Sequence, residues 1–167
     1  MKLQYYKPNA KNQGTACSFN VQTKAKGIGS DGKERNVRGV YMEMIKQTSW
    51  DKQKKVGGFK DGEKINIKFS KTEAASIIDT FERMQDTRMF HTTGDSSTSI
   101  QIKPWVTPQG EYKGFGLTVK QGDSLFRIPF TPGEVVEIRE WLKFALQRTF
   151  TAMYNDYKKS RSTKTSQ

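Results

Sequence analysis

Aromatic and basic residues lie close together in two stretches of this 167-residue chain, one in each half. Every nucleobase has a flat π face, so an aromatic side chain beside cationic ones can bind a single strand with little sequence preference. In both stretches the residues fall where a strand is expected to end. The candidate nucleic-acid-binding residues are Lys46, Trp50, Lys52, Lys54 and Lys55 in the first half, and Lys103, Trp105, Tyr112, Lys113 and Phe115 in the second.

Two of these aromatic residues are expected on opposite faces of their strands. Successive side chains of a strand point to opposite faces. Because Ile102 is expected to face the core, Lys103 and Trp105 should lie together on the exposed face. Phe115 has the same parity as Leu117, and this alternation alone predicts a core residue. The sequence therefore predicts Trp105 as a stacking platform.

The charge balance indicates a polyanionic partner. The chain has 29 Lys and Arg against 17 Asp and Glu, a net charge of +12. Its isoelectric point is near 9.8. The basic segment 158–164 holds only four of these cations, so most of the excess belongs to the folded part. A basic excess spread over a folded domain favours nucleic acid as the partner.

The residues needed for catalysis are sparse. His91 is the only histidine and Cys17 the only cysteine, which excludes metal sites built from several of these residues. The sequence has no phosphate-binding loop and no motif of a serine nucleophile. Its carboxylates are scattered, and a metal-dependent nuclease built from them is the remaining catalytic alternative. We therefore predict a protein that is not an enzyme and needs no cofactor or metal.

Composition also bounds the compartment. Hydrophobic residues make up 34% of the chain and the mean hydropathy is −0.80. No apolar run has the length of a membrane span and no apolar leader is visible. A lone cysteine is typical of a reducing compartment. We expect an intracellular protein without a membrane partner, suited to the cytoplasm of a bacterium or of a phage-infected host and associated with the nucleoid.

The elements that position these residues follow from a phrase that occurs twice, at 64–73 and 125–134. In each copy three apolar residues alternate with other residues, as in a half-buried strand. A hydroxyl residue follows at once, with Glu three positions later, which is the capping box of a helix. Phe130 follows Phe69 by 61 positions, and the caps are separated by the same interval. This spacing predicts a duplicated unit.

Each unit contains about four expected strands and one helix, so the fold class predicted is α+β, with antiparallel strands. A single four-stranded sheet with one helix leaves an apolar face uncovered, and two units should bury it by packing together. We expect one domain at 1–157, built of repeats at about 1–88 and 89–157. The second helix should end near Tyr157, and 158–167 should form a flexible basic tail.

The run from Ile100 to Leu117 resembles the DNA-binding core of the transcriptional positive cofactor four family. Here a strand ends in Lys103 and Trp105, a Pro/Gly turn follows, and Lys113 with Gly114 opens the next strand. The duplicated layout resembles the Whirly proteins and, more distantly, the Pur-alpha repeats. The resemblance implies a Whirly-like fold that binds single-stranded DNA. By position, it places nucleic acid on Lys103, Trp105, Lys113 and Phe115.

The function predicted is non-catalytic binding of single-stranded DNA in replication, recombination, repair or transcription. An RNA-binding or RNA-chaperone module is the first alternative, because stacking platforms also accept RNA. A polymerase-associated protein whose basic face meets an acidic partner is the second. A homo-oligomer and a replication or transcription protein are the protein partners that fit these functions.

Overall fold

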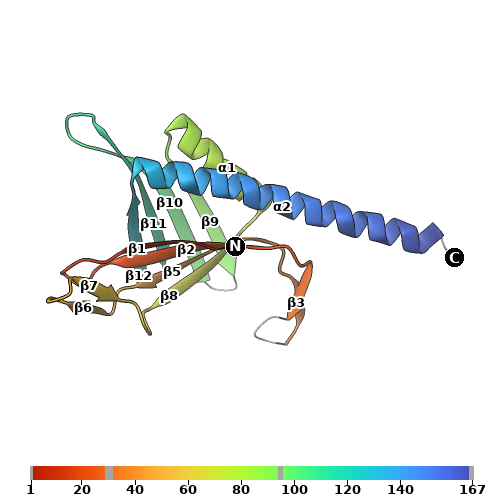
Figure 1. Cartoon of the computed structure of the whole chain (residues 1–167), viewed down its shortest axis with the longest axis horizontal. Helices are drawn as coiled ribbons and strands as arrows, with labels where there is room; N and C mark the ends of the chain where they lie inside the picture. The colour runs from red at the N-terminus through yellow and green to blue at the C-terminus, as the bar shows by residue number, and fades with distance from the viewer. Residues whose placement is uncertain (1, 29–31, 94–95, 166–167) are drawn as a thin grey trace.

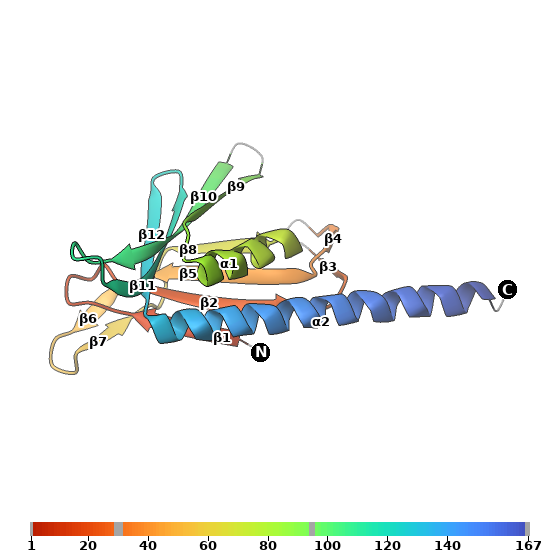
Figure 2. The same cartoon turned by 90° about the horizontal axis from the view of Figure 1, so that it is seen from above.

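The structure is a computed structural model that describes residues 2–28, 32–93 and 96–165. The described residues form two four-stranded antiparallel sheets, two short hairpins and two helices (Figure 1). The first sheet has the order β1-β2-β5-β8 and the second the order β12-β11-β10-β9. In Figure 2 the two sheets lie at an angle to each other, with α1 and α2 beside them.

The first unit contains the elements up to the first helix. Its sheet consists of β1 (Lys2–Lys7), β2 (Thr15–Gln22), β5 (Gly39–Lys46) and β8 (Lys64–Phe69). Two hairpins are inserted between these strands: β3 (Lys26–Ile28) with β4 (Glu34–Asn36), and β6 (Ser49–Asp51) with β7 (Val56–Gly58). Helix α1 (Lys71–Arg83) follows β8 directly.

The second unit repeats the order of four strands and a helix. Its elements are β9 (Thr87–Thr93), β10 (Ser96–Val106), β11 (Tyr112–Gln121), β12 (Ser124–Phe130) and α2 (Pro132–Thr165). In both sheets the four strands pair in chain order, and the helix follows the fourth strand. The predicted α+β class, with two packed units of four antiparallel strands and one helix, is confirmed.

The duplicated phrase has the same local geometry in both units. The amide of Glu73 donates to Ser70 Oγ (3.1 Å), and the amide of Ser70 donates to Glu73 Oε2 (2.8 Å). In the second unit Glu134 N donates to Thr131 Oγ1 (3.4 Å), and Thr131 N donates to Glu134 Oε2 (2.7 Å). Each helix therefore begins with two orphan backbone donors satisfied.

A single hydrophobic core joins the units. The inner faces of both sheets and the apolar faces of both helices contribute to it. The Tyr5 ring of the first sheet meets the Phe130 ring of the second edge to face, with centroids 5.3 Å apart. Cys17 is buried in the same core. The inner face of each sheet is thus covered, as the pairing of two units predicts.

Helix α2 is longer than predicted. It passes Tyr157, where we expected it to end, and continues to Thr165, projecting away from the body of the molecule (Figures 1 and 2). No Gly or Pro follows Gly133, so nothing in the sequence stops the helix. Contacts one turn apart support it: Arg161 Nη1 donates to Tyr157 Oη (3.2 Å). The predicted helix end near Tyr157 was therefore wrong. The flexibility of the tail expected at 158–167 stays a prediction, and residues 166 and 167 lie outside the described residues. In the described parts of the chain, neither helix combines the length and apolar character that crossing a membrane requires.

Candidate nucleic-acid interface

The second sheet has one face in the core and one face in solvent. On β10, Ile100 and Ile102 are buried in the core. Lys103 and Trp105 point the other way, and the Trp105 side chain is 50% exposed. The predicted alternation on β10 and the predicted exposure of Trp105 are confirmed.

We call this solvent-facing side of the second sheet the outer face. Strand pairing places its side chains in rows, and directly opposed side chains lie about 4.5–5.5 Å apart at Cβ. One row joins Arg88, Gln101, Thr118 and Arg127, and the next joins Phe90, Ser99, Lys120 and Leu125. The outer face consists of Arg88, Phe90, Thr92, Ser97, Ser99, Gln101, Lys103, Trp105, Gly116, Thr118, Lys120, Leu125, Arg127 and Pro129.

The charge on the outer face has one sign. Arg88, Lys103, Lys120 and Arg127 are exposed, and none of them forms an ion pair with a described residue. The described outward side chains of β9 to β12 include no carboxylate. Cations without carboxylate neighbours keep their attraction for a phosphate backbone. The outer face is therefore an electropositive surface.

Two exposed aromatic side chains lie toward opposite ends of this face. Phe90 is 72% exposed and pairs across the sheet with Ser99, six residues before Trp105 on β10. At about 3.4 Å per residue, this separation is roughly 20 Å along the strand. Between the two rings, a Cβ added at Gly116 would meet no atom within 4 Å, so the surface there is flat and open. The face could accept a strand with bases stacked near both ends.

The placement of Phe115 by family resemblance was wrong. Its side chain is 0% exposed. The ring packs edge to face against Phe81 of α1, with centroids 5.0 Å apart, and against Tyr112 at 6.0 Å. A ring enclosed in the core cannot stack on a base. The alternation that Phe115 shares with Leu117 had correctly predicted a core position. Tyr112 is half-buried beside it, and this burial raises the pKa of the Tyr112 phenol.

Two of the predicted lysines have carboxylate partners. Lys113 Nζ lies 2.6 Å from Glu111 Oε1. Lys46 Nζ lies 2.6 Å from Glu63 Oε2 and 5.0 Å from the centre of the Phe126 ring, so it bridges the two units. The hydrogen bond from Lys46 lowers the pKa of the Glu63 carboxyl. Lys46 ends β5 of the first sheet and Lys113 lies near the start of β11 in the second. The charge of both lysines is partly offset.

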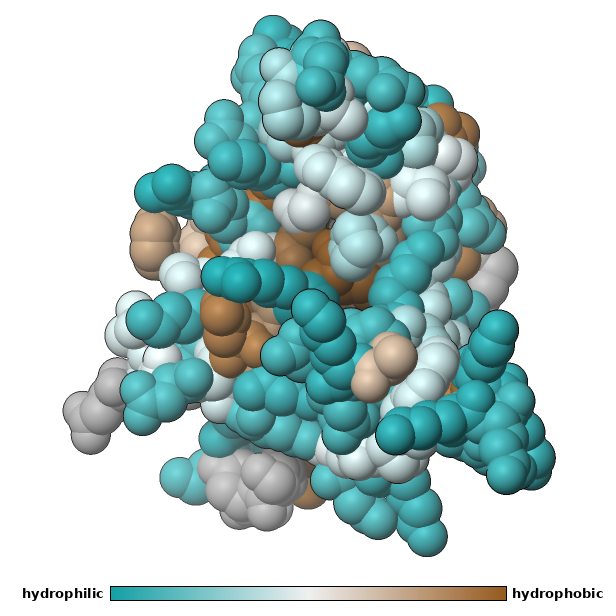
Figure 3. Space-filling model, turned by 90° about the vertical axis from the view of Figure 1, so that its left-hand side faces the viewer, coloured by the Kyte–Doolittle hydropathy of each residue, from teal (hydrophilic) through white to brown (hydrophobic). Residues whose placement is uncertain are grey.

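The other predicted residues of the first half lie on a separate hairpin. Trp50 is half-buried in β6, and Lys52, Lys54 and Lys55 are exposed in the turn before β7. Asp51 Oδ1 accepts hydrogen bonds from the amides of residues 53 and 54, both at 2.9 Å, which fixes this turn. The turn and the β10–β11 connection lie at the same end of the molecule (Figures 1 and 2). Seen from that end, the surface is mainly hydrophilic around an apolar hollow (Figure 3).

The structure also adds residues that the sequence analysis missed, namely Arg88, Phe90, Lys120 and Arg127. The alternation of buried and exposed positions along each strand already indicated that some of these side chains face solvent. Arg127, for example, stands between the core residues Phe126 and Ile128. Strand order was the missing information, because only pairing brings these residues beside Lys103 and Trp105. Within the described ranges, no three His, Cys, Asp or Glu side chains form a group that could hold a metal ion.

Comparisons with known proteins identify the fold. No protein-family model matches the sequence, and no curated protein matches it. Among solved structures, WHY3 from Arabidopsis thaliana matches with a TM-score of 0.63 and 16% identity, over 96% of each chain. The plant transcriptional regulator PBF-2 matches with a TM-score of 0.62 and 16% identity, over 94% of this chain and 87% of that one. WHY1 from Arabidopsis thaliana matches with a TM-score of 0.62 and 14% identity, over 96% and 92%.

These matches extend over almost the whole chain and include both units. The fold is therefore the Whirly fold, as the duplicated layout predicted.

Proposed function

We propose that this protein binds single-stranded nucleic acid without catalysis, with single-stranded DNA as its ligand, and that the outer face of the second sheet is the binding surface. The observation that carries the proposal is the composition of this face. It combines two exposed aromatic rings with four cations that have no ion-pair partner among the described residues.

In this mechanism the aromatic rings and the cations act on different parts of the strand. Bases stack on Trp105 and Phe90, while Arg88, Lys103 and Arg127 attract the phosphates between them. A duplex cannot bind in the same way, because its paired bases hide their faces. The binding therefore favours single strands and shows little preference for sequence.

The Whirly fold supports this proposal by analogy, since PBF-2 is a plant transcriptional regulator with the same fold. A protein of this kind would sequester or present single strands in replication, recombination, repair or transcription. It would act inside the cell, on nucleoid DNA, alone or as a homo-oligomer.

The proposed surface can be tested against the other basic surface of the protein. We expect Arg88→Gln combined with Arg127→Gln to weaken binding of a deoxythymidine oligomer strongly. Lys52→Gln combined with Lys54→Gln, on the β6–β7 hairpin, removes the same charge from another exposed site and should weaken it less. If the hairpin pair has the larger effect, the outer face is not the main site.

Two further titrations separate the alternatives. Tighter binding of a ribo-oligomer than of the matched deoxy-oligomer would favour the RNA-binding alternative. Absence of binding to either oligomer would favour a basic face that meets an acidic protein partner.

A further inference from the structure

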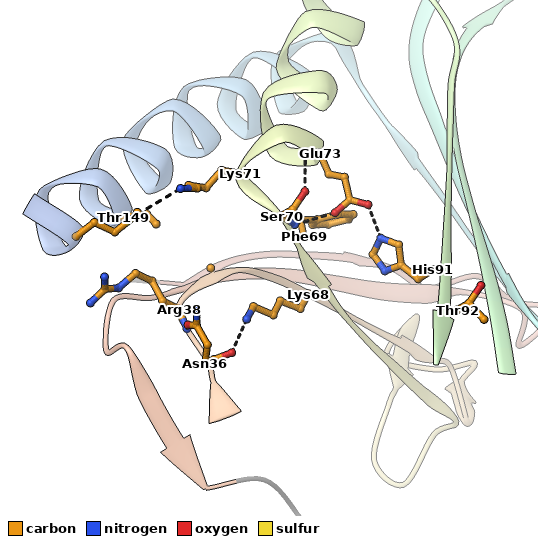
Figure 4. A pocket seen from close by; sticks show the side chains of 12 residues that line it. Asn36, Arg38, Lys68, Phe69, Ser70, Lys71, Glu73, His91, Thr92 and Thr149 are labelled. Carbon is orange, nitrogen blue, oxygen red and sulfur yellow. Dashed lines mark hydrogen bonds and ion pairs between the residues drawn. The ribbon is translucent and has the colours of Figure 1, made fainter. Parts of the chain in front are cut away.

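A second basic feature lies where the two units meet. A pocket of about 570 Å³ opens between the start of β5, the end of β8, the start of α1, β9 and α2 (Figure 4). Three cationic side chains from different elements line it, together with polar and apolar neighbours. The lining residues used below are Arg38, Lys68, Lys71, Glu73, His91 and Thr92.

The two lysines of this pocket have unused hydrogen-bond donors. Lys68 Nζ donates to the carbonyl of Asn36 (2.6 Å). Among the described residues, Lys71 Nζ contacts the Met153 sulfur at 3.5 Å and the face of the Phe150 ring at 5.4 Å. Neither ammonium lies within 4 Å of a carboxylate of the described residues. Because an ammonium group has three donors, each lysine can still bind an oxyanion.

The third cation and the one carboxylate of the pocket are already held in place. Arg38 donates from Nε to the Thr23 carbonyl (2.8 Å) and pairs with Asp156 of α2. Its side chain is only 12% exposed, and Asp156 offsets its charge, so Arg38 forms a fixed part of the wall. Glu73 accepts from the Ser70 amide and lies 2.7 Å from His91 Nε2.

The capping role of Glu73 leaves the pocket electropositive. Partial burial acts to raise the pKa of Glu73, but the hydrogen bonds from Ser70 and His91 outweigh it and lower the pKa. The carboxylate is thus ionised and committed to the cap of α1. Arg38 is compensated by Asp156, but Lys68 and Lys71 have no carboxylate partner among the described residues and still outnumber this single acid. The N-terminus of α1 is satisfied by its own cap.

We propose that this pocket binds a phosphate group through Lys68 and Lys71. Thr92, which lines the pocket, lies on the same face of β9 as Arg88 and Phe90. A strand that crosses the outer face can therefore reach the pocket at the β9 edge. The proposal of a phosphate site depends only on the cations of the pocket. The route of a nucleic acid strand into it rests on the proposed function.

Pyrophosphate is the probe for the pocket, because it has no base that could stack on the outer face. We expect calorimetric titration to show binding to the wild-type protein at constant ionic strength. The double variant Lys68→Gln/Lys71→Gln should bind at least about tenfold more weakly, because two charge-assisted contacts are lost. Lys11→Gln, which removes an exposed lysine from the β1–β2 loop, is the matched control and should bind like the wild type. Equal binding by the double variant, or no binding by the wild type, would overturn the proposal.

A parallel titration identifies the source of the phosphate. If a nucleic acid strand supplies it, the double variant also loses affinity for a deoxythymidine oligomer. If a free nucleotide supplies it, the variant loses affinity for thymidine triphosphate and keeps that for the oligomer. A protein that binds pyrophosphate but no oligomer would retain this pocket while contradicting the proposed function. Melting temperatures close to that of the wild type show that the variants are folded.

Discussion

Trp105 exposes half of its surface two residues after Lys103, on a strand whose inward side chains Ile100 and Ile102 are buried. Proteins usually bury a tryptophan or use its ring in an interface. The ring has no aromatic neighbour among the described ring contacts, so its outer surface is free to meet a ligand.

We predict that Trp105→Ala leaves the melting temperature almost unchanged and weakens single-strand binding. The loss of one stacked base is worth about 1–3 kcal/mol, which is roughly fivefold to more than a hundredfold in affinity. A thermal melt and an oligonucleotide titration on the purified variant measure both quantities. A large drop in melting temperature with unchanged affinity would remove Trp105 from the site.

Phe115 and Phe90 differ in burial: the Phe115 ring is enclosed in the core, and the Phe90 ring is exposed. We predict that Phe115→Ala lowers the free energy of unfolding by about 3–5 kcal/mol, because it opens a cavity against Phe81. Phe90→Ala should change it by less than about 0.5 kcal/mol and should weaken oligonucleotide binding. Urea denaturation of both variants checks the first statement. Equal stability of the two variants would show that the assignment of core and surface is incorrect.

At the scale of elements, the two strand-and-cap phrases were predicted well from the sequence because their signals are local. Alternation and a capping box are determined by neighbouring residues, and both occur at the predicted positions. The order of the strands in each sheet depends on contacts between distant residues, which one sequence does not contain. For this reason Trp105 and Lys103 were predicted, whereas Phe90 and Arg88 on the neighbouring strand were not.

The end of α2 and the position of Phe115 failed for different reasons. The helix end was inferred from polar composition, but Lys and Arg are good helix formers and no Gly or Pro interrupts this segment. Phe115 was placed by resemblance to another family, while its alternation with Leu117 already predicted burial. Where the two kinds of argument disagreed, the local physical pattern was correct.

The caps predict how stability responds to acid. Glu134 accepts hydrogen bonds from Thr131 and lies 2.5 Å from Lys7 Nζ. Partial burial of Glu134 acts to raise its pKa. The contacts with Lys7 and Thr131 outweigh this effect, so the pKa of Glu134 lies below its ordinary value near 4.5. A carboxyl whose pKa is lower in the folded state stabilises the fold above its unfolded pKa, and this contribution is lost as the pH falls through the folded pKa.

We therefore predict that wild-type stability declines below about pH 4.5 and that Glu134→Gln reduces this decline. At neutral pH the variant should be less stable by roughly 0.5–2 kcal/mol, the usual value of a cap interaction. Glu111→Gln, in the exposed β10–β11 turn, is the control carboxylate and should change stability little. Denaturation curves at several pH values measure the stability of the wild type and of Glu134→Gln. If both depend on pH in the same way, the cap of α2 is not the titrating element.

At the scale of the whole molecule, the net charge of +12 is distributed unevenly. Many cations form ion pairs, including Lys7, Lys46 and Lys113. Those of the outer face have no such partners among the described residues, and the same holds for Lys52, Lys54 and Lys55 of the β6–β7 hairpin. On the outer face these cations lie beside exposed aromatic rings. The arrangement explains how a chain with many surface ion pairs can still present a basic surface on its second sheet.

Binding to single and double strands at two salt concentrations tests the central claim most directly. The account predicts that a deoxythymidine oligomer binds more tightly than a duplex of the same length at moderate salt, because only the single strand can stack on Trp105 and Phe90. If all four cations of the outer face neutralise phosphates, log affinity should fall by about 2.8 per unit of log salt, at about 0.7 for each phosphate. Equal affinity for the two nucleic acids, or an affinity that does not change with salt, would contradict it.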